Sequence, residues 1–397
     1  MRRREILVLL AVGLDLAGFG MVFPDIQTRA ESYLHGRDSP GLWIGALLAT
    51  SFIVQLLASP RWGRVSDRLG RGPIFVICQL LSGAGLLIYG LAANYPILVL
   101  SRVVSGLGSA NVAVAQAWAS DQVEGKAGRL GRMAAAISTG LVAGPAAGGF
   151  LAHYGGNLLV GCVGASLSLT GAALGYLGMR GAPPPSRSQA AEPPRKRRIL
   201  DLSLLKRFPG VEPLLVIAVI GSFSLATLEG TFGRLIKRIL GFGEREFGIV
   251  FAYESLLGAL VGGVLLASLA HRFRERSLLR TAFLLQGIGL ALNPVAGPLQ
   301  PYVPGMAVLL FASTLYAVGA GVANPTLAAA VSRLVPESVQ GELFGLLQVA
   351  RNFGFVVGPI LGGLLFDWEP AAPYLFAGIV SVMTAFFIPK ARGAQEG

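Results

Sequence analysis

The sequence predicts an all-α membrane protein with twelve transmembrane helices in two pseudo-symmetric six-helix bundles. Three observations lead to this fold class. Apolar residues make up 53% of the 397 positions and charged residues only 14%, against about 25% charged residues in a soluble domain. Apolar runs of spanning length follow one another along the chain. A polar segment divides these runs into two sets that resemble each other weakly.

The apolar runs define the predicted spans. A bilayer core is about 30 Å thick, so a spanning helix needs roughly 20 apolar residues. The twelve runs lie near residues 6–26, 41–60, 73–93, 96–118, 133–152, 157–178, 213–233, 247–269, 279–297, 304–330, 343–366 and 371–389. The first run could be read as a signal peptide, but Asp15 interrupts it and no small-residue cleavage site follows before the charged loop. We therefore expect a retained helix.

The two halves are predicted to be separated by a cytoplasmic linker at 181–212. This segment is rich in Pro, Ser and Arg and cannot bury a core. It divides an N-terminal bundle at 1–180 from a C-terminal bundle at 213–397. The run "GPAAGG" at 144–149 matches "GPILGG" at 358–363 in its Gly and Pro positions. Because both copies run in the same topological sense, a binding site is expected between the halves near mid-membrane.

The basic residues predict that both termini are cytoplasmic. If the runs alternate across the membrane, twenty-five of the 33 Lys and Arg residues fall on the side of the N-terminus and six on the other, a strong positive-inside bias. The net charge of +12 lies between apolar runs and not on an aromatic-rich basic face, so no nucleic-acid partner is expected. The preference for Arg over Lys suggests a GC-rich bacterial genome and hence a bacterial inner membrane.

Enzymatic chemistry is not indicated. The sequence contains no G-x-x-x-x-G-K-[ST], G-x-S-x-G or H-E-x-x-H motif. Its two cysteines lie in apolar runs without a C-x-x-C pair, and its three histidines lie at or near predicted loops. We therefore expect no catalytic residues, no cofactor and no metal site. The apolar spans make membrane lipids an expected partner.

The loop after the second run reads "GRVSDRLGRG" from Gly63 to Gly72. Gly63 is expected to allow close helix approach and Gly70 a tight turn, while the arginines anchor the cytoplasmic side. A carboxylate here can lie at a neighbouring helix N-terminus, where the helix dipole favours it. Charge alone does not explain this order of residues.

This loop resembles the signature of the major facilitator superfamily, G-x-x-x-D-R-x-G-R, although Gly72 stands where that family has a further basic residue. The fourth run is similar to the family's R-x-x-x-G motif at Arg102 and Gly106. The fifth resembles its antiporter motif, and "LDLAGFGMVFP" in the first resembles tetracycline-efflux-like proteins. The resemblance covers essentially the whole chain and favours the twelve-helix drug:proton antiporter branch. The loop after the eighth run, "SLAHRFRERS", lacks the Asp and both glycines of the signature.

The resemblance implies roles for two groups of residues. Asp67 would close the cytoplasmic gate by meeting the eleventh helix, and Arg71 would pair with Asp121. The full gating motif is Gly63, Asp67, Arg68, Gly70, Arg71 and Asp121. The helix 5 antiporter motif, which would shape a helix interface, is Gly140, Gly144, Pro145, Gly148 and Gly149. Simple helix packing remains the alternative for these glycines.

Ionisable residues inside predicted spans are costly and usually functional. Asp15 lies about ten residues into the first run, roughly 15 Å deep at 1.5 Å per residue. In the family the arginine corresponding to Arg102 faces helix 1, so an interaction of Asp15 with Arg102 is predicted. Separation of Asp15 from Arg102 would let Asp15 capture a proton. The alternative is that the two residues form a purely structural ion pair. Glu229 and Glu254 are candidates for a second protonation site, for attraction of cations, or for partial exposure at the cavity mouth.

Further polar residues in the spans are candidates for the substrate cavity. They are Gln55, Asn111, Gln116, Gln286, Asn324, Gln348, Arg351 and Asn352. Arg351 can serve an anionic substrate group or stabilise the bundle. The resemblance implies secondary active transport by alternating access, namely proton-coupled efflux of amphipathic drugs or other small molecules. The expected partners are then a small-molecule substrate and protons, and the expected state is a monomer. A lipid, sugar or metabolite transporter of the same superfamily, and a membrane sensor without transport, are the alternatives.

Overall fold

The structure is a computed structural model that describes residues 3–120, 126–180, 207–208, 210–335 and 337–389. Every regular element in these ranges is helical. The described residues fall into two compact units. Unit 1 comprises those of Met1–Ile199 and Phe242–Ala252, and unit 2 those of Leu200–Gly241 and Tyr253–Gly397.

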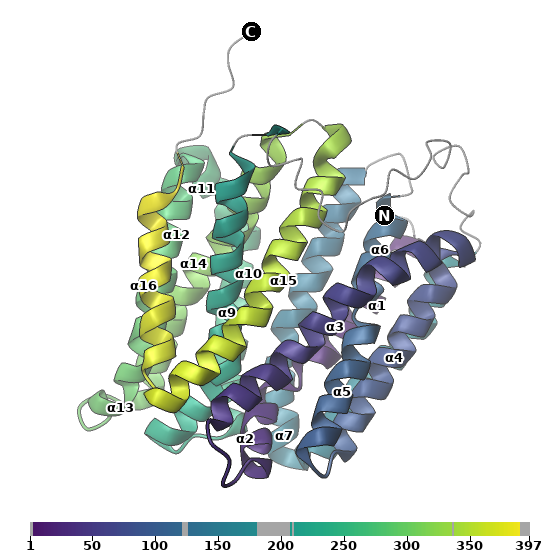
Figure 1. The fold of residues 1–397 in the computed structure, drawn as a ribbon. Helices are drawn as coiled ribbons and strands as arrows, with labels where there is room; N and C mark the ends of the chain where they lie inside the picture. The colour runs from purple at the N-terminus through teal and green to yellow at the C-terminus, as the bar shows by residue number, and fades with distance from the viewer. Residues whose placement is uncertain (1–2, 121–125, 181–206, 209, 336, 390–397) are drawn as a thin grey trace. The chain divides into compact units, whose positions relative to one another are not determined.

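Unit 1 contains seven complete helices and the start of an eighth (Figure 1). They are α1 (Arg3–Gly20), α2 (Phe23–Tyr33), α3 (Pro40–Leu69), α4 (Arg71–Leu91), α5 (Tyr95–Gly108), α6 (Asn111–Ser120), α7 (Lys126–Met179) and the first part of α10 (Glu244–Leu260). Turns near residues 21–22 and 109–110 divide α1 from α2 and α5 from α6, but each pair reads as one apolar span.

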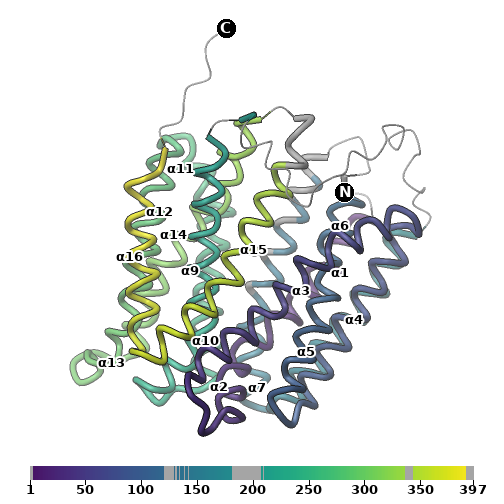
Figure 2. The backbone as a smooth tube through the Cα atoms, viewed as in Figure 1, coloured from purple at the N-terminus to yellow at the C-terminus, as the bar shows by residue number. Residues whose placement is uncertain are grey.

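Unit 2 contains the remaining described helices. They are α9 (Val211–Leu240), the rest of α10, a π-helical turn (Val261–Leu265), α11 (Leu266–Arg272), α12 (Glu275–Leu292), a 3-10 turn (Asn293–Val295), α13 (Ala296–Leu299), α14 (Gly305–Arg333), α15 (Glu337–Trp368) and α16 (Ala372–Phe387). Within this unit α16 packs against both α12 and α9 (Figure 2).

The described helices account for all twelve predicted runs. Ten stretches of helix are long and apolar enough to cross a membrane, and α16 is a shorter apolar helix. The 54-residue α7 covers two predicted runs, 133–152 and 157–178. Its backbone leaves the helical region at Gly156, where φ is 62° and ψ is −165°. Because a side chain is disfavoured at that φ, glycine permits the break between the two runs.

Glycines bring α7 directly onto α1. A Cβ placed on Gly144 would lie 2.5 Å from the Ala17 carbonyl oxygen and 2.7 Å from the Gly20 Cα. One turn before, Gly140 meets the Gly13 carbonyl of α1 in the same way, and one turn after, Gly148 meets the backbone of Met21, directly after α1. Lipid offers no hydrophobic drive for helix association, so this close backbone contact supplies packing energy that larger side chains would prevent.

Unit 2 repeats this contact between α15 and α9. A Cβ on Gly354 would lie 2.5 Å from the Val219 carbonyl oxygen, and one on Gly358 would lie 2.8 Å from the Phe223 carbonyl oxygen. Both series advance by four residues on each helix. The weak sequence repeat around the two Gly-Pro motifs therefore corresponds to the same type of helix contact in both units.

The α1–α7 contact predicts a sharp effect of Gly148→Leu. The new side chain would overlap the Met21 backbone, and overpacking costs about 1–3 kcal/mol or more where the backbone must move. We expect a lower unfolding temperature in detergent, measured by differential scanning fluorimetry. Gly345→Ala is the matched control, since no described atom lies within 4 Å of a Cβ at that position. Equal unfolding temperatures for both variants would refute the importance of the close contact.

Candidate functional site

Asp15 lies in a buried polar pocket inside unit 1. Its side chain is 1% exposed. Asn111 Nδ2 of α6 donates to Oδ2 at 2.5 Å, and Ser168 Oγ of α7 donates to Oδ1 at 2.6 Å. Ser82 of α4 lies beside the same carboxyl. Helices α6 and α7 thus supply neutral donors to the acid of α1, which stabilise a carboxylate without neutralising its charge.

Arg102 lies elsewhere in the unit. This residue is 3% exposed, its Nε donates to Ser101 Oγ at 3.2 Å, and its guanidinium carbon is 5.4 Å from the centre of the Tyr89 ring. Within the described ranges Asp15 and Arg102 form no ion pair. The predicted interaction between Asp15 and Arg102 is therefore wrong for this conformation, because the guanidinium is held against an aromatic face instead.

A polar cluster that the sequence did not predict lies at the end of unit 1 away from the start of α1. The Tyr89 hydroxyl donates to Asp25 Oδ2, and Arg29 Nη1 donates to the Tyr89 carbonyl oxygen at 2.8 Å. With its amide nitrogen facing Asp25, Asn157 donates to Oδ2 at 2.8 Å and accepts from Arg29 Nε at 2.9 Å. The signal that could have found it is the pair Asp25 and Arg29, which share one face of a helix at spacing four.

The acidic side chains of unit 2 lie near one another. Glu229 of α9 and Glu254 of α10 are within electrostatic reach of each other, and both act on the Tyr316 hydroxyl of α14. Ser313 of α14 lies beside Glu254. Both glutamates are partly buried. This arrangement brings two carboxyls from different helices together, and such a cluster attracts a cation or shares a proton.

The predicted cavity residues of unit 1 have different surroundings. Asn111 is fully buried and belongs to the Asp15 pocket. Gln55 is half-buried and donates through Nε2 to the Ser109 carbonyl oxygen at 3.1 Å. Gln116 is half-buried on α6. Only Asn111 is therefore brought to the candidate proton site.

The predicted cavity residues of unit 2 divide in the same way. Gln348 donates to Asn352 Oδ1 at 3.0 Å along α15, with Gln348 exposed and Asn352 buried. Arg351 is half-buried on the same helix. Gln286 of α12 is buried and Asn324 of α14 is exposed. The α15 residues form one polar stretch, while the other two lie on separate helices.

The gating-motif residues lie at the junction of α3 and α4. Arg71 Nη1 contacts Asp67 Oδ1 at 2.6 Å and donates to Ser66 Oγ at 2.6 Å. Arg68 is exposed. Gly70 has a φ of 97°, as the expected tight turn requires. The predicted partner Asp121 lies outside the described residues.

Gly63 departs from the expectation of close helix approach. No described atom lies within 4 Å of a Cβ placed there, so the space around it is open in this structure. The helix 5 motif, in contrast, is tightly packed. Gly140 and Gly144 contact α1, and Pro145 Cδ contacts Gly20 of α1. Gly148 contacts Met21 in the turn after α1, and Gly149 contacts α10.

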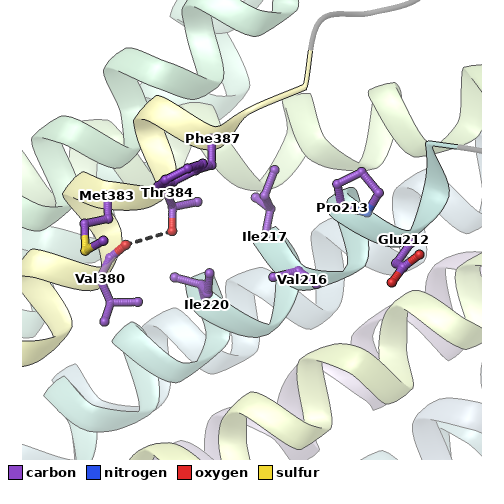
Figure 3. Close-up of a pocket in the computed structure, with 9 residues that line it drawn as sticks. All are labelled: Glu212, Pro213, Val216, Ile217, Ile220, Val380, Met383, Thr384 and Phe387. Carbon is purple, nitrogen blue, oxygen red and sulfur yellow. Dashed lines mark hydrogen bonds between the residues drawn. The ribbon is translucent and has the colours of Figure 1, made fainter.

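An apolar groove lies between α9 and α16 of unit 2 (Figure 3). Its volume is about 570 Å³. Its lining residues are Glu212, Pro213, Val216, Ile217, Ile220, Val380, Met383, Thr384 and Phe387. The Thr384 hydroxyl is engaged by the Val380 carbonyl oxygen of its own helix at 2.7 Å, and Glu212 lies at one end of the groove (Figure 3). None of the residues predicted for the substrate cavity lines this groove, so the two sites are different.

The ten long apolar stretches of helix among the described residues, together with buried ionisable side chains, define a multi-pass membrane protein. A family model described as the Major Facilitator Superfamily matches residues 6–243 and 214–396. The chain belongs to this superfamily, and it is a transporter and not an enzyme. The predicted family, the helical fold class and the absence of an enzymatic role are thereby confirmed.

Similar bacterial proteins include ones named as drug-resistance proteins. Multidrug resistance protein 1 of Bacillus subtilis (strain 168) is 30% identical over 369 residues, covering 91% of this chain and 89% of the relative. Tetracycline resistance protein, class C, of Escherichia coli is 28% identical over 381 residues, covering 90% and 88%. The solved structure of a D-xylose-proton symporter superposes with a TM-score of 0.76 over 99% of both chains at 16% identity, which shows the shared fold.

The cluster around Arg29 predicts a large effect of Arg29→Met on stability. Arg29 is 9% exposed and Asp25 is 8% exposed, so the change removes the positive charge from a buried cluster that keeps its carboxylate. Removing one member of a buried charged network costs about 3–5 kcal/mol. We expect a clear fall in unfolding temperature in detergent. Arg37→Met is the control, because Arg37 is exposed and stacks on Trp43; a similar loss in both variants would contradict the prediction.

Proposed function

We propose that this protein is a proton-coupled exporter of amphipathic small molecules. It would work by alternating access between an N-terminal bundle at 1–180 and a C-terminal bundle at 213–397 joined by the linker at 181–212. It would act as a monomer in a bacterial inner membrane, with both termini cytoplasmic and lipid around the helices. The observation that carries the proposal is the Asp15 pocket, in a chain whose relatives include multidrug and tetracycline resistance proteins.

Asp15 has the features of a proton carrier. It lies in the middle of an apolar span, is 1% exposed, and is hydrogen-bonded by neutral groups from α6 and α7. A carboxyl without a paired cation can be neutralised by a proton, whereas a tight ion pair would keep it charged. Movement of α1 against its neighbours would change the number of donors that reach it. The carboxyl would then take up a proton in one conformation and release it in another.

The glutamates of unit 2 support export of cationic compounds. Glu229 and Glu254 place two carboxyls near Tyr316. A lipophilic cation contacting this cluster would find a negative charge beside an aromatic ring, which is the combination that binds organic cations. Protonation of the cluster would weaken that binding. Substrate and protons would therefore compete, as antiport requires.

The direct test is proton movement in proteoliposomes that carry a pH-sensitive dye. Addition of a lipophilic cation or a tetracycline-like compound should trigger proton flux through the wild type, and Asp15→Asn should abolish it because the amide cannot carry a proton. Asp38→Asn is the control, since Asp38 is exposed in a loop. Full proton flux through Asp15→Asn would exclude Asp15 from the coupling path. Silence of the wild type across a drug panel would refute drug:proton exchange.

The cation hypothesis for unit 2 has a separate test. Glu229→Gln and Glu254→Gln should each weaken binding of a lipophilic cation roughly tenfold, because one lost charge contact in a partly buried site is worth about 1.4 kcal/mol. Binding of an uncharged compound of similar shape should change little. Isothermal titration calorimetry on the purified protein measures both. Glu369→Gln, at an exposed position, is the control, and equal losses for both compounds would argue against charge recognition.

A further inference from the structure

Buried polar side chains follow the contact between α4 and α5 from the Tyr89 end towards Asp15. The guanidinium of Arg102 faces Tyr89, Ser105 packs against Gly85, and Gly108 packs against Ser82. These contacts show that α4 and α5 run antiparallel, because residues later in α5 meet residues earlier in α4. Ser82 lies beside the Asp15 carboxyl. Tyr89 and Ser82 are seven residues apart on α4, so this path is about 10 Å long.

Three polar atoms on this path have no hydrogen-bonding partner within the described part of the chain. They are Nη2 of Arg102, Oγ of Ser105 and Oγ of Ser82. All three residues are at most 3% exposed. Leaving a buried polar atom unpaired costs about 1–3 kcal/mol. Here a donor stands at one end of the path, and two hydroxyls that can accept stand between it and Asp15.

Tyr89 holds the guanidinium at its observed place. Its ring lies 5.4 Å from the guanidinium carbon of Arg102 and 5.2 Å from that of Arg29. Tyr89 is fully buried, and its hydroxyl donates to Asp25. Asn157 and Arg29 fix the other side of this cluster. The ring therefore cannot turn away without breaking the Asp25 hydrogen bond.

We propose that Tyr89, anchored by Asp25, is a positioning residue that keeps Arg102 away from Asp15, and that Ser105 and Ser82 receive the guanidinium when it is released. The Arg102 side chain then has two positions. Against Tyr89 it leaves Asp15 with neutral partners only. Turned along α4 and α5 it hydrogen-bonds the two serine hydroxyls and approaches the carboxylate. This inference rests on the proposed role of Asp15 in proton coupling. It adds that the position of the Arg102 side chain controls when Asp15 takes up and releases its proton.

The charges around Asp15 make its proton affinity sensitive to this movement. The elements packed on α1 present Asn111 from α6, Ser168 from α7, and Ser82 and the Cys78 thiol from α4 to the Asp15 carboxyl. None of these side chains is a cation. An approaching guanidinium would therefore be the strongest electrostatic influence on the carboxyl, and it would favour the charged form. Arrival of Arg102 would expel the proton from Asp15.

The test is an infrared pH titration of the purified protein in lipid. The carbonyl band of protonated Asp15 is the band that disappears in Asp15→Asn. In Tyr89→Leu the ring face is lost, and we expect half-protonation about one pH unit or more below the wild-type value. Tyr89→Phe keeps the ring and should shift less than half as far. Tyr95→Phe is the matched control, because its hydroxyl donates to the Trp43 carbonyl oxygen at the same end of the unit and does not contact Arg102.

Two further variants isolate the guanidinium and its receivers. Adding Arg102→Gln to Tyr89→Leu should cancel the shift, since the incoming charge is gone. Adding Ser82→Ala and Ser105→Ala to Tyr89→Leu should reduce it. A titration of Tyr89→Leu that matches the wild type overturns the proposal. A shift that survives Arg102→Gln overturns it as well, because a general loosening of the bundle would then be the cause.

The titration uses no drug and needs no transport. Absence of drug-driven proton flux in the wild type would refute the proposed export function, whereas the titration reports on Arg102 and Asp15 in either case. Unfolding temperatures of all variants accompany the measurement. If a variant unfolds at a lower temperature, its titration is compared with that of Tyr89→Phe. Because Tyr89→Phe keeps the packing of the ring, this comparison distinguishes a change in the position of Arg102 from a loss of stability.

Discussion

The backbone contact between α1 and α7 is the constraint on which unit 1 depends. Lipid provides no hydrophobic drive between helices, so close van der Waals packing and interhelical hydrogen bonds must hold the bundle together. Gly140 and Gly144, four residues apart on α7, allow the carbonyl oxygens of Gly13 and Ala17 on α1 to approach to contact distance. After the break at Gly156, the second part of α7 meets α1 through Gly164 and Gly171, and this contact places Ser168 Oγ 2.6 Å from Asp15 Oδ1. Packing and chemistry are therefore parts of one interface.

The acid at this interface has an unusual set of partners. Its hydrogen bonds come from an amide and a hydroxyl, while the arginine that could neutralise it is held by an aromatic ring. A buried ion pair tends to be a static feature, since removing either member leaves an uncompensated charge. A carboxyl with neutral partners has an inexpensive alternative, which is protonation. The separation of Asp15 from Arg102 is thus what makes a titrating role physically accessible.

The two units use the same helix contact for different chemistry. α15 meets α9 through glycines spaced as on α7, yet the acids of unit 2 lie on α9 and α10 and face Tyr316. The polar cluster of Asp25, Arg29 and Asn157 lies in unit 1. The two units therefore share the glycine-mediated helix contact but not the arrangement of their buried acidic residues.

The sequence by itself determined the fold class, the family and the positions of the spans. Apolar length and the Gly-Pro motifs are local properties, and they survive any rotation of a helix about its axis. Only the tertiary structure decided which side chains meet. In the structure Arg102 contacts Tyr89 and not Asp15, and Asp25 is paired with Asn157, 132 positions away. Gly63 has no close neighbour. The reason is that partners in a bundle depend on helix register and rotation, which arise from packing over many residues and are not encoded at any single position.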